Sequence, residues 1–368
     1  MFVSNDVIHD PRVLKEADAL HRAGHQVSFI GWDRSGHLPQ TEDRDGVLIR
    51  RVRTTGFMWL LWKDLFRNPV WWQRAYNLAM KTPFDVVHCH DLDTLPIGVR
   101  LKETTGKPLV YDCHEVFHRM IAGDVPRFVT NYAARMERRL VPTADRILVV
   151  SQVVADYITE ISGRDSLVVA NYPDFMVDVY SPPPAKPLTV LYLGNLHPSR
   201  FILPAIDVIG AMPDVKLVIA GSKKLAPQVA AMCAERPNTR FLGNVPNNRI
   251  LPLILDCHVM LSMFDPTVWV NAMGLPNKVF EAMAAGRPSI VTEKGLIAEV
   301  VEREQCGFAV PYTRAGFTSA VVALRDEPSL VERLGRNGLK AVRREYNWGR
   351  EARKLVELYD GLSGRPKA

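Results

Sequence analysis

Short apolar runs alternate with segments of helical periodicity along the first half of the chain. The runs are rich in β-branched residues, each ends at a polar residue or a glycine, and they lie at 27–31, 86–90, 109–112 and 147–151. Between them, the segments 11–23 and 127–140 place apolar residues at the spacing of an amphipathic helix. This alternation predicts βαβ units and therefore a parallel sheet.

A second alternation of the same kind follows a proline-rich segment at 181–187, which predicts a stiff linker. Its strands are predicted near 188–194, 215–220, 239–242, 258–262 and 288–292. We therefore expect an α/β protein with doubly wound domains at 1–180 and 188–345. The last segment, 346–368, is expected to be helical and able to return to the N-terminal domain. Because ligands of such sheets bind at the carboxyl ends of the strands, we expect two such edges to face one central cleft.

The composition is that of an ordinary globular chain, with 47% hydrophobic and 23% charged residues in 368 positions. No apolar run reaches the roughly 18 residues of a spanning helix, and no secretory signal pattern opens the chain. Five scattered cysteines without a Cys-x-x-Cys pair predict buried, reduced thiols and a cytoplasmic location. The net charge of +6 fits anionic partners without selecting among them.

The most informative polar pattern lies at 274–286. Its Gly-Leu-Pro start predicts the beginning of a helix, and Gly286 predicts its end. Asn277, Lys278 and Glu281 lie between these points, in a helix that is otherwise apolar. A buried carboxylate needs hydrogen-bond donors. An amide, a cation and a carboxylate at a helix N-terminus suit a ligand that carries both phosphate and hydroxyl groups.

This segment resembles the donor-binding helix of the retaining, family 4-like (group 1) glycosyltransferases of the GT-B fold. Similarity continues in the expected order at 10–17, 88–91, 111–115, 144–151, 191–196, 218–221, 241–245 and 346–348. The resemblance implies two Rossmann-like domains and transfer of a sugar from a UDP- or GDP-linked donor. It implies no cofactor, and no nucleic-acid partner is expected.

By the same resemblance, Glu281 binds the donor ribose and Lys278 the phosphates, while Arg200 neutralises the diphosphate. The other predicted donor contacts are Asn277, Gly194, Asn195, Lys223, Gly274 and Leu275. Two positions depart from the family. A lysine expected five residues after Arg200 is Ala205, so Lys223 or Lys278 is expected to replace it. A glutamate expected eight residues before Glu281 is Met273, which leaves the donor sugar open.

Residues of the N-terminal half are expected at the acceptor. His114 resembles the histidine that approaches the donor sugar and acceptor, and we predict it to be catalytic together with Arg200 and Lys278. The predicted acceptor contacts are Asp10, Arg12, Asp91 and Glu115. The family's usual glycine pair is absent from the first loop, and Asp10 can alternatively cap the helix that begins at Pro11.

A dense polar cluster, His88, His90, Asp91 and Asp93, offers metal-binding side chains. Asp91-Leu92-Asp93 also looks like the Asp-x-Asp motif of metal-dependent transferases. We nevertheless predict no metal and favour an acceptor-side loop, because the resembled fold holds diphosphate with protein cations.

Aromatic and basic residues are concentrated at 56–78. They include Phe57, Trp59, Trp62, Lys63, Phe66, Arg67, Trp71, Trp72 and Arg74. Such a mixture is typical of a surface that contacts an anionic membrane or a lipid-linked acceptor. A buried pair of helices is the alternative.

Taken together, these patterns predict a hexosyltransferase that acts on a glycan or lipid-linked acceptor in cell-surface polysaccharide synthesis. It is expected in the cytoplasm or peripherally on the inner membrane face. A sugar-nucleotide epimerase of the same fold and a non-catalytic partner subunit are the alternatives. The chain lacks a Gly-x-Gly-x-x-Gly fingerprint and a Gly-x-Ser-x-Gly turn, which disfavours dinucleotide oxidoreductases and serine hydrolases.

Overall fold

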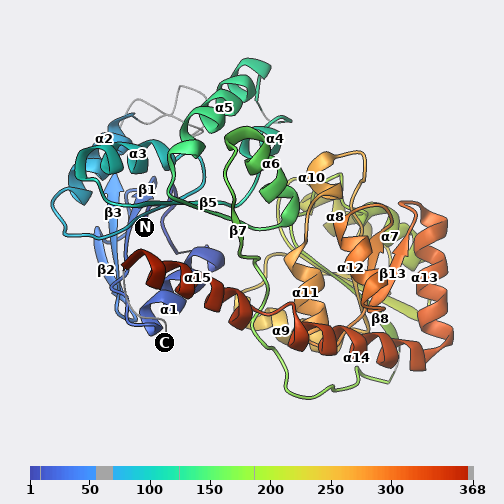
Figure 1. Cartoon of the computed structure of the whole chain (residues 1–368). Helices are drawn as coiled ribbons and strands as arrows, with labels where there is room; N and C mark the ends of the chain where they lie inside the picture. The colour runs from blue at the N-terminus through green and yellow to red at the C-terminus, as the bar shows by residue number, and fades with distance from the viewer. Residues whose placement is uncertain (9, 55–68, 124, 186, 364–368) are drawn as a thin grey trace. The chain divides into compact units, whose positions relative to one another are not determined.

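The computed structural model describes residues 1–8, 10–54, 69–123, 125–185 and 187–363. The chain forms two compact units, Met1–Asn171 with Glu351–Ala368, and Tyr172–Arg350. Each unit contains a mainly parallel sheet with helices on its faces (Figure 1). The predicted α/β class is therefore confirmed.

The strands of the first unit are β1 (Ser28–Asp33), β2 (Thr41–Arg44), β3 (Val47–Arg53), β4 (Val87–His90), β5 (Leu109–Cys113), β6 (Arg146–Val149) and β7 (Leu167–Val168). They pair in the orders β2-β3-β1 and β4-β5-β6-β7, and only the β2–β3 pair among them is antiparallel. Phe2 bridges in parallel to both Ile30 and Cys89, so the first residues lie between β1 and β4. The pairing of β4 with β5 places His90 opposite Asp112.

Helices cover this sheet. They are α1 (Pro11–Arg22), α2 (Pro69–Ala79), α3 (Leu95–Thr105), α4 (Phe117–Met120), α5 (Arg127–Leu140), α6 (Gln152–Ser162) and, from Glu351 onward, α15 (Trp348–Ser363). Side chains of α15 hold it to this unit. Glu351 accepts a hydrogen bond from the Ala170 N–H at 2.8 Å, and Tyr359 lies 2.6 Å from His88 Nδ1.

The strands of the second unit are β8 (Leu188–Leu193), β9 (Val215–Ala220), β10 (Thr239–Phe241), β11 (Val259–Ser262), β12 (Ser289–Thr292) and β13 (Gly307–Val310). Their order is β10-β9-β8-β11-β12-β13, with every pairing parallel. Chain order reverses between β8 and β11. Open α/β sheets bind ligands at such a switch point, outside the carboxyl ends of the strands.

The helices of the second unit are α7 (Ile202–Gly210), α8 (Ala226–Ala234), α9 (Ile250–Asp256), α10 (Trp269–Ala272), α11 (Asn277–Ala284), α12 (Leu296–Arg303), α13 (Arg314–Asp326) and α14 (Pro328–Arg344). One core packs α7 and α13 against β8 and β9. A second packs α11, α12 and α14 together. The second core places Val279 and Phe280, in the first turn of α11, with Val291 of β12.

Details of these elements differ from expectation at a few points. Pro276 is the N-cap residue of α11 rather than its first helical residue. Gly286 does end the helix, with φ at 69°, and a Cβ there would lie 2.9 Å from the Tyr180 ring. All five cysteines are buried and unpaired, as predicted. Among the described helices, none is long and apolar enough to span a membrane.

Candidate active-site residues in the two units

The loops that follow β8 and β9 are held close together in the second unit. Gly221 directly follows β9, and a Cβ on it would lie 1.9 Å from the Gly194 carbonyl oxygen. The Leu196 N–H also donates to the Ser222 carbonyl at 2.8 Å. Because of this approach, the predicted donor contacts Gly194, Asn195 and Lys223 belong to adjoining loops at one sheet edge. Asn195 and Lys223 are both exposed there.

Arg200 lies at the switch point of this sheet. Backbone hydrogen bonds from Phe201 to Met263, at 3.1 Å, and from Asp265 to Ser199, at 2.8 Å, join the loops after β8 and β11. The Arg200 guanidinium stacks over the Phe264 ring at 3.5 Å from its centroid. Its Nη1 is buried and has no hydrogen-bond partner within the described chain. Burial lowers the pKa of Arg200, so an anion at this position would compensate a desolvated charge.

On α11, Lys278 and Glu281 form an ion pair. The Lys278 Nζ donates to both carboxylate oxygens, at 2.9 and 2.7 Å, and the two side chains are 29% and 17% exposed. The carboxylate therefore has donors even without a ligand, which the sequence argument did not foresee. Asn277 is exposed in the first turn of α11.

The segment before α11 is also shaped by close contacts. A Cβ on Gly274 would lie 2.7 Å from the Val270 carbonyl oxygen, so a larger residue would displace the loop. Leu275 packs on the apolar core around α11. A small hollow near this loop is lined by Ser262 and Thr292, at the ends of β11 and β12, and by Phe264, the residue on which Arg200 stacks.

In the first unit, the polar side chains converge on Asp112 at the end of β5. Arg12 donates to its Oδ1 at 2.9 Å and to its Oδ2 at 3.3 Å. The same Oδ2 lies 2.6 Å from His114 Nε2 and 3.1 Å from His90 Nδ1. On its other side, His114 Nδ1 lies 3.5 Å from Asp91.

These contacts set the charges of the cluster. Burial raises the pKa of Asp112, but Arg12 and His114 outweigh it and hold this pKa well below the usual value. Burial likewise lowers the pKa of His114, yet attraction to Asp91 and Asp112 prevails and raises it to about 10. His114 is therefore an imidazolium at neutral pH, a hydrogen-bond donor at both nitrogens rather than a base.

The prediction that Arg12 contacts an acceptor is wrong. Its side chain is 5% exposed, and besides Asp112 it contacts the Val169 carbonyl at 2.9 Å and Glu16 at 3.1 Å. Asp10 caps α1 by accepting from the Val13 N–H at 3.4 Å, which confirms the capping alternative for this residue.

The polar residues of β4 divide between core and surface. His88 and His90 are 1% exposed, so they do not belong to an acceptor-side loop. Asp91 follows them with φ at 63° and a side chain that is 39% exposed. Glu115 is exposed as well. Asp91 and Glu115 thus remain accessible to a ligand, whereas the two histidines support the cluster from beneath.

Four buried side chains lie close enough together to be considered as metal ligands. Potential ligand atoms of Glu16, His88, His90 and Asp112 lie within 4.8 Å of one another. The Arg12 guanidinium, however, contacts both carboxylates, at 3.1 and 2.9 Å. It supplies the positive charge that a cation would bring, and we assign this group as a buried polar cluster built around the Arg12–Asp112 ion pair.

The aromatic segment at 56–78 is described only in its last part. Residues 55–68, including Phe57, Trp59, Trp62, Lys63, Phe66 and Arg67, lie outside the described residues. Trp71 is 1% exposed and stacks on Trp32 at 5.3 Å, and Trp72 donates to the Asp93 carbonyl at 2.8 Å. Trp71 therefore belongs to the core, as in the buried alternative.

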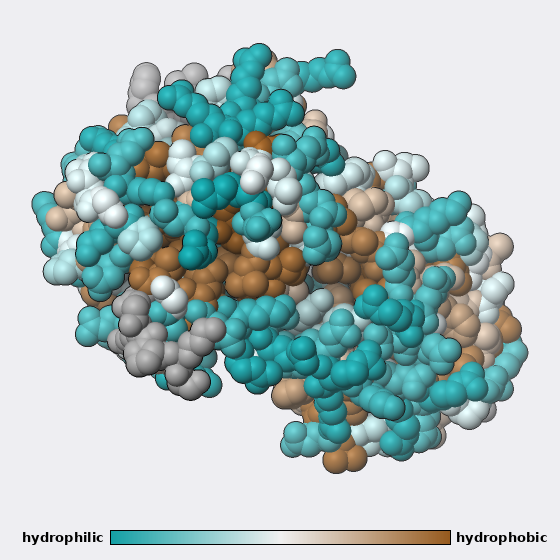
Figure 2. Space-filling view, in the orientation of Figure 1, coloured by the Kyte–Doolittle hydropathy of each residue, from teal (hydrophilic) through white to brown (hydrophobic). Residues whose placement is uncertain are grey.

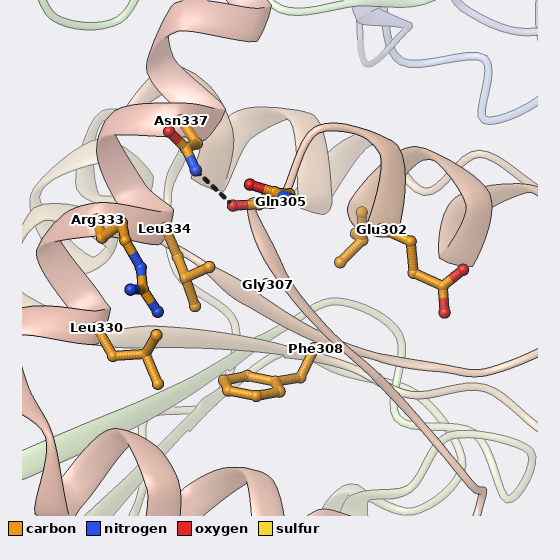
Figure 3. A pocket seen from close by; sticks show the side chains of 9 residues that line it. Glu302, Gln305, Gly307, Phe308, Leu330, Arg333, Leu334 and Asn337 are labelled. Carbon is orange, nitrogen blue, oxygen red and sulfur yellow. Dashed lines mark hydrogen bonds between the residues drawn. The ribbon is translucent and has the colours of Figure 1, made fainter.

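A cavity of about 550 Å³ lies away from these residues, between α12, β13 and α14 (Figure 3). Phe308, Leu330 and Leu334 form its apolar part, and Asn337 donates to the Gln305 carbonyl at 3.0 Å. It adjoins Gly307, at the amino end of β13, whereas ligands of such sheets bind at the carboxyl ends. We do not assign it to the active site.

Comparison with known proteins identifies the family. Residues 12–171 match the sequence model of Glycosyltransferase Family 4, and residues 187–327 match that of Glycosyl transferases group 1. The chain is a family 4-like, group 1 glycosyltransferase. Its class of reaction is therefore glycosyl transfer.

Individual relatives of this glycosyltransferase are distant but nearly full-length. Glycogen synthase of Mycobacterium tuberculosis (strain H37Rv) is 26% identical, with 93% of this chain and 88% of the relative covered. Phosphatidyl-myo-inositol mannosyltransferase of Mycobacterium leprae is 25% identical, with 80% and 78% covered.

Solved structures show the same fold. Sucrose-phosphate synthase from Thermosynechococcus elongatus superposes with a TM-score of 0.78 at 17% identity, covering 96% of this chain and 92% of that one. Anabaena HepE in complex with UDP and glucose gives 0.72 at 14% identity, covering 98% of each chain. The predicted GT-B fold is thereby confirmed.

Proposed function

We propose that this glycosyltransferase moves a sugar from a UDP- or GDP-linked donor to a hydroxyl of a glycan or lipid-linked acceptor, with retention of anomeric configuration. The observation that carries the donor assignment is Arg200, which is half-buried and whose Nη1 has no hydrogen-bond partner within the described chain. HepE structures in complex with UDP and UDP-glucose give further support. A role in cell-surface polysaccharide synthesis fits this acceptor class.

The donor-binding residues have distinct roles in this proposal. Arg200 pairs with the diphosphate, for which a planar and permanently charged guanidinium is well suited. Glu281 accepts hydrogen bonds from the ribose hydroxyls. Lys278 holds the Glu281 carboxylate in place, 2.7 Å away, and adds positive charge beside the N-terminus of α11. Exposed Lys223 is a second cation at the neighbouring loop.

The reaction then needs no carboxylate nucleophile. The acceptor oxygen attacks the anomeric carbon on the face from which the diphosphate departs, and the acceptor proton passes to the departing phosphate oxygen. Arg200 stabilises the negative charge that develops on the diphosphate. His114, an imidazolium, donates a hydrogen bond to an oxygen of the sugar or acceptor. We propose that no divalent metal takes part.

A screen of sugar nucleotides tests this proposal. A ligand present at about 100 times its dissociation constant stabilises a protein by roughly 2.7 kcal/mol, so a thermal-shift panel of UDP- and GDP-sugars should reveal the donor. That donor is then incubated with and without an acceptor. Transfer that survives EDTA supports the proposal. Failure to bind any donor, epimerisation of the donor alone, or dependence on added Mg²⁺ or Mn²⁺ would contradict it.

The first unit also offers a basic surface for an anionic membrane, which we propose as a peripheral contact. On α5, four arginines are exposed, namely Arg127, Arg135, Arg138 and Arg139. Phe128 and Tyr132 are 63% and 41% exposed beside them. The one acidic residue of α5, Glu137, is 1% exposed and accepts the Tyr157 hydroxyl at 2.6 Å. Hydrophilic side chains dominate this end of the unit, at the top of Figure 2.

Vesicle sedimentation tests the membrane contact. Each basic residue near an anionic surface contributes about 1 kcal/mol, so binding to phosphatidylglycerol vesicles should weaken with salt. Arg135→Gln with Arg139→Gln should release the protein, whereas Arg333→Gln with Arg336→Gln, on exposed α14 positions, should not. Equal binding of both double variants would refute the assignment of α5.

A further inference from the structure

We infer that Asp112 is a positioning residue that holds His114 with its Nε2–H on the Asp112 carboxylate, so that the Nδ1–H, 3.5 Å from Asp91, is the one presented to the substrate. The inference rests on the proposed function, in which His114 contacts the sugar or the acceptor. It assigns a role to a residue that the sequence analysis did not single out.

The geometry around Asp112 leaves its carboxylate little freedom. Asp112 is fully buried at the end of β5, and Arg12 spans both of its oxygens, at 2.9 and 3.3 Å. Arg12 is itself fixed by a hydrogen bond to the Val169 carbonyl. The carboxylate is thus held from below, and its Oδ2 lies 2.6 Å from His114 Nε2. A fixed acceptor at this nitrogen determines the orientation of the ring.

Two imidazoles contact Asp112 Oδ2, but only the His114 imidazole carries a positive charge. His90 Nδ1 lies 3.1 Å from this oxygen and 3.4 Å from His114 Nε2, close enough for two cations to repel each other. Burial lowers the pKa of His90. His114 has the second carboxylate, Asp91, at 3.5 Å from its Nδ1. The proton therefore stays on His114, and His90 serves as a neutral donor to Asp112.

The charges of the ionisable groups around His114 balance one another, which allows the cluster to be buried. Arg12 and His114 carry two positive charges, and Asp112, Asp91 and Glu16 offer three carboxyl groups. Burial and the charge of Asp112 raise the pKa of Glu16, and its oxygens accept no hydrogen bond within the described chain. Burial raises the pKa of Asp91 to about 7. Once Asp91 is ionised, a proton on Glu16 leaves the five groups neutral together. Glu115, exposed beside His114, and neutral His88 beneath His90 complete the surroundings.

Two isosteric substitutions in this buried cluster should have different effects on the pKa of His114. Asp112→Asn removes the charge that faces His114. An opposite charge at this distance shifts a pKa by about 1–3 units, so the pKa of His114 should fall by that amount. Glu16→Gln removes a carboxyl group whose pKa burial raises to about 8 and whose oxygens accept no hydrogen bond from His114, so it should lower the pKa of His114 less than Asp112→Asn does. A merely structural role for Asp112 would not distinguish the two variants.

The test is a titration of ¹³C,¹⁵N-histidine-labelled protein followed by NMR, with His114 assigned by its loss in His114→Gln. In the wild type, both ring nitrogens should remain protonated beyond pH 8. Asp112→Asn should lower the pKa of His114. The sugar-transfer rate of this variant, relative to the wild type, should fall more at pH 8 than at pH 6. A neutral His114 in the wild type, or equal shifts in both variants, would overturn the inference, and the wild-type result stands even where Asp112→Asn does not fold.

This readout is independent of the proposed function because no substrate is present. An imidazolium at His114 in a protein that transfers no sugar would count against the function alone. Transfer by a protein whose His114 is neutral at pH 7 would count against the inference alone.

Discussion

Lys278 and Glu281 lie one turn apart on α11, and the Lys278 ammonium donates to both oxygens of the Glu281 carboxylate at 2.9 and 2.7 Å. The pair is already formed without a ligand, so under the proposed function the acceptor atoms for the ribose are in place before the donor arrives. The Glu281 carboxylate, however, neutralises part of the Lys278 charge. Under the same proposal the diphosphate relies chiefly on Arg200, whose Nη1 has no hydrogen-bond partner within the described chain.

Substitution of Arg200 tests that division of roles. Arg200→Ala should weaken UDP or GDP binding by roughly 1.5–3 kcal/mol, about 10- to 150-fold, because a charge-assisted hydrogen bond is lost. The thermal midpoint without ligand should change little, because Nη1 has no hydrogen-bond partner within the described chain and the loss is confined to stacking on the Phe264 ring. Calorimetry gives the affinity, with Arg333→Ala, an exposed arginine on α14, as the control. Equal affinities of the two variants would remove Arg200 from the donor site.

His114 should matter for turnover and not for nucleotide affinity. It belongs to the first unit, whereas Arg200, Lys278 and Glu281 all belong to the second. We expect His114→Ala to lower the transfer rate and leave the dissociation constant for UDP or GDP within about twofold. Normal turnover would reduce His114 to a structural residue.

Much of the fold follows from local patterns. The alternation of apolar runs and helical periodicity is enough to place all five strands predicted in the second half, and α5 begins and ends where its pattern does. β13 escaped notice because its sequence, Gly-Phe-Ala-Val, is short and only half-buried. The β2–β3 pair was not predicted because β2 is polar and lies at the edge of the three-stranded sheet.

The candidate site is less predictable, because its contacts join residues that are far apart in sequence. Arg12 and Asp112 are 100 positions apart, and only the fold shows that they pair. The charged residue at the end of an apolar run, Asp112 after Leu109–Tyr111, was the available signal. Arg12 was misassigned because a charged residue at a helix start usually faces solvent, whereas here a buried carboxylate lies within its reach.

The His114 ion pairs should give stability a defined dependence on pH. Its pKa is raised to about 10 in the folded protein, against about 6.5 in an unfolded chain. The folded state therefore binds the proton more tightly, and this stabilisation is complete below about pH 6.5 and lost as pH rises through 10. The difference in thermal midpoint between wild type and His114→Gln should shrink from pH 6.5 to 9.5. Parallel curves would show that the imidazolium contributes nothing.

Calorimetric titration of the protein with UDP and with GDP, in the wild type and in Glu281→Ala, is the most direct test of the central claim. The account predicts that the wild type binds at least one of them. A folded Glu281→Ala should bind it about 10- to 150-fold more weakly, which corresponds to charge-assisted hydrogen bonds worth roughly 1.5–3 kcal/mol. Unchanged affinity in Glu281→Ala, or no binding of either nucleotide to the wild type, would contradict the assignment of α11 as the donor-binding helix.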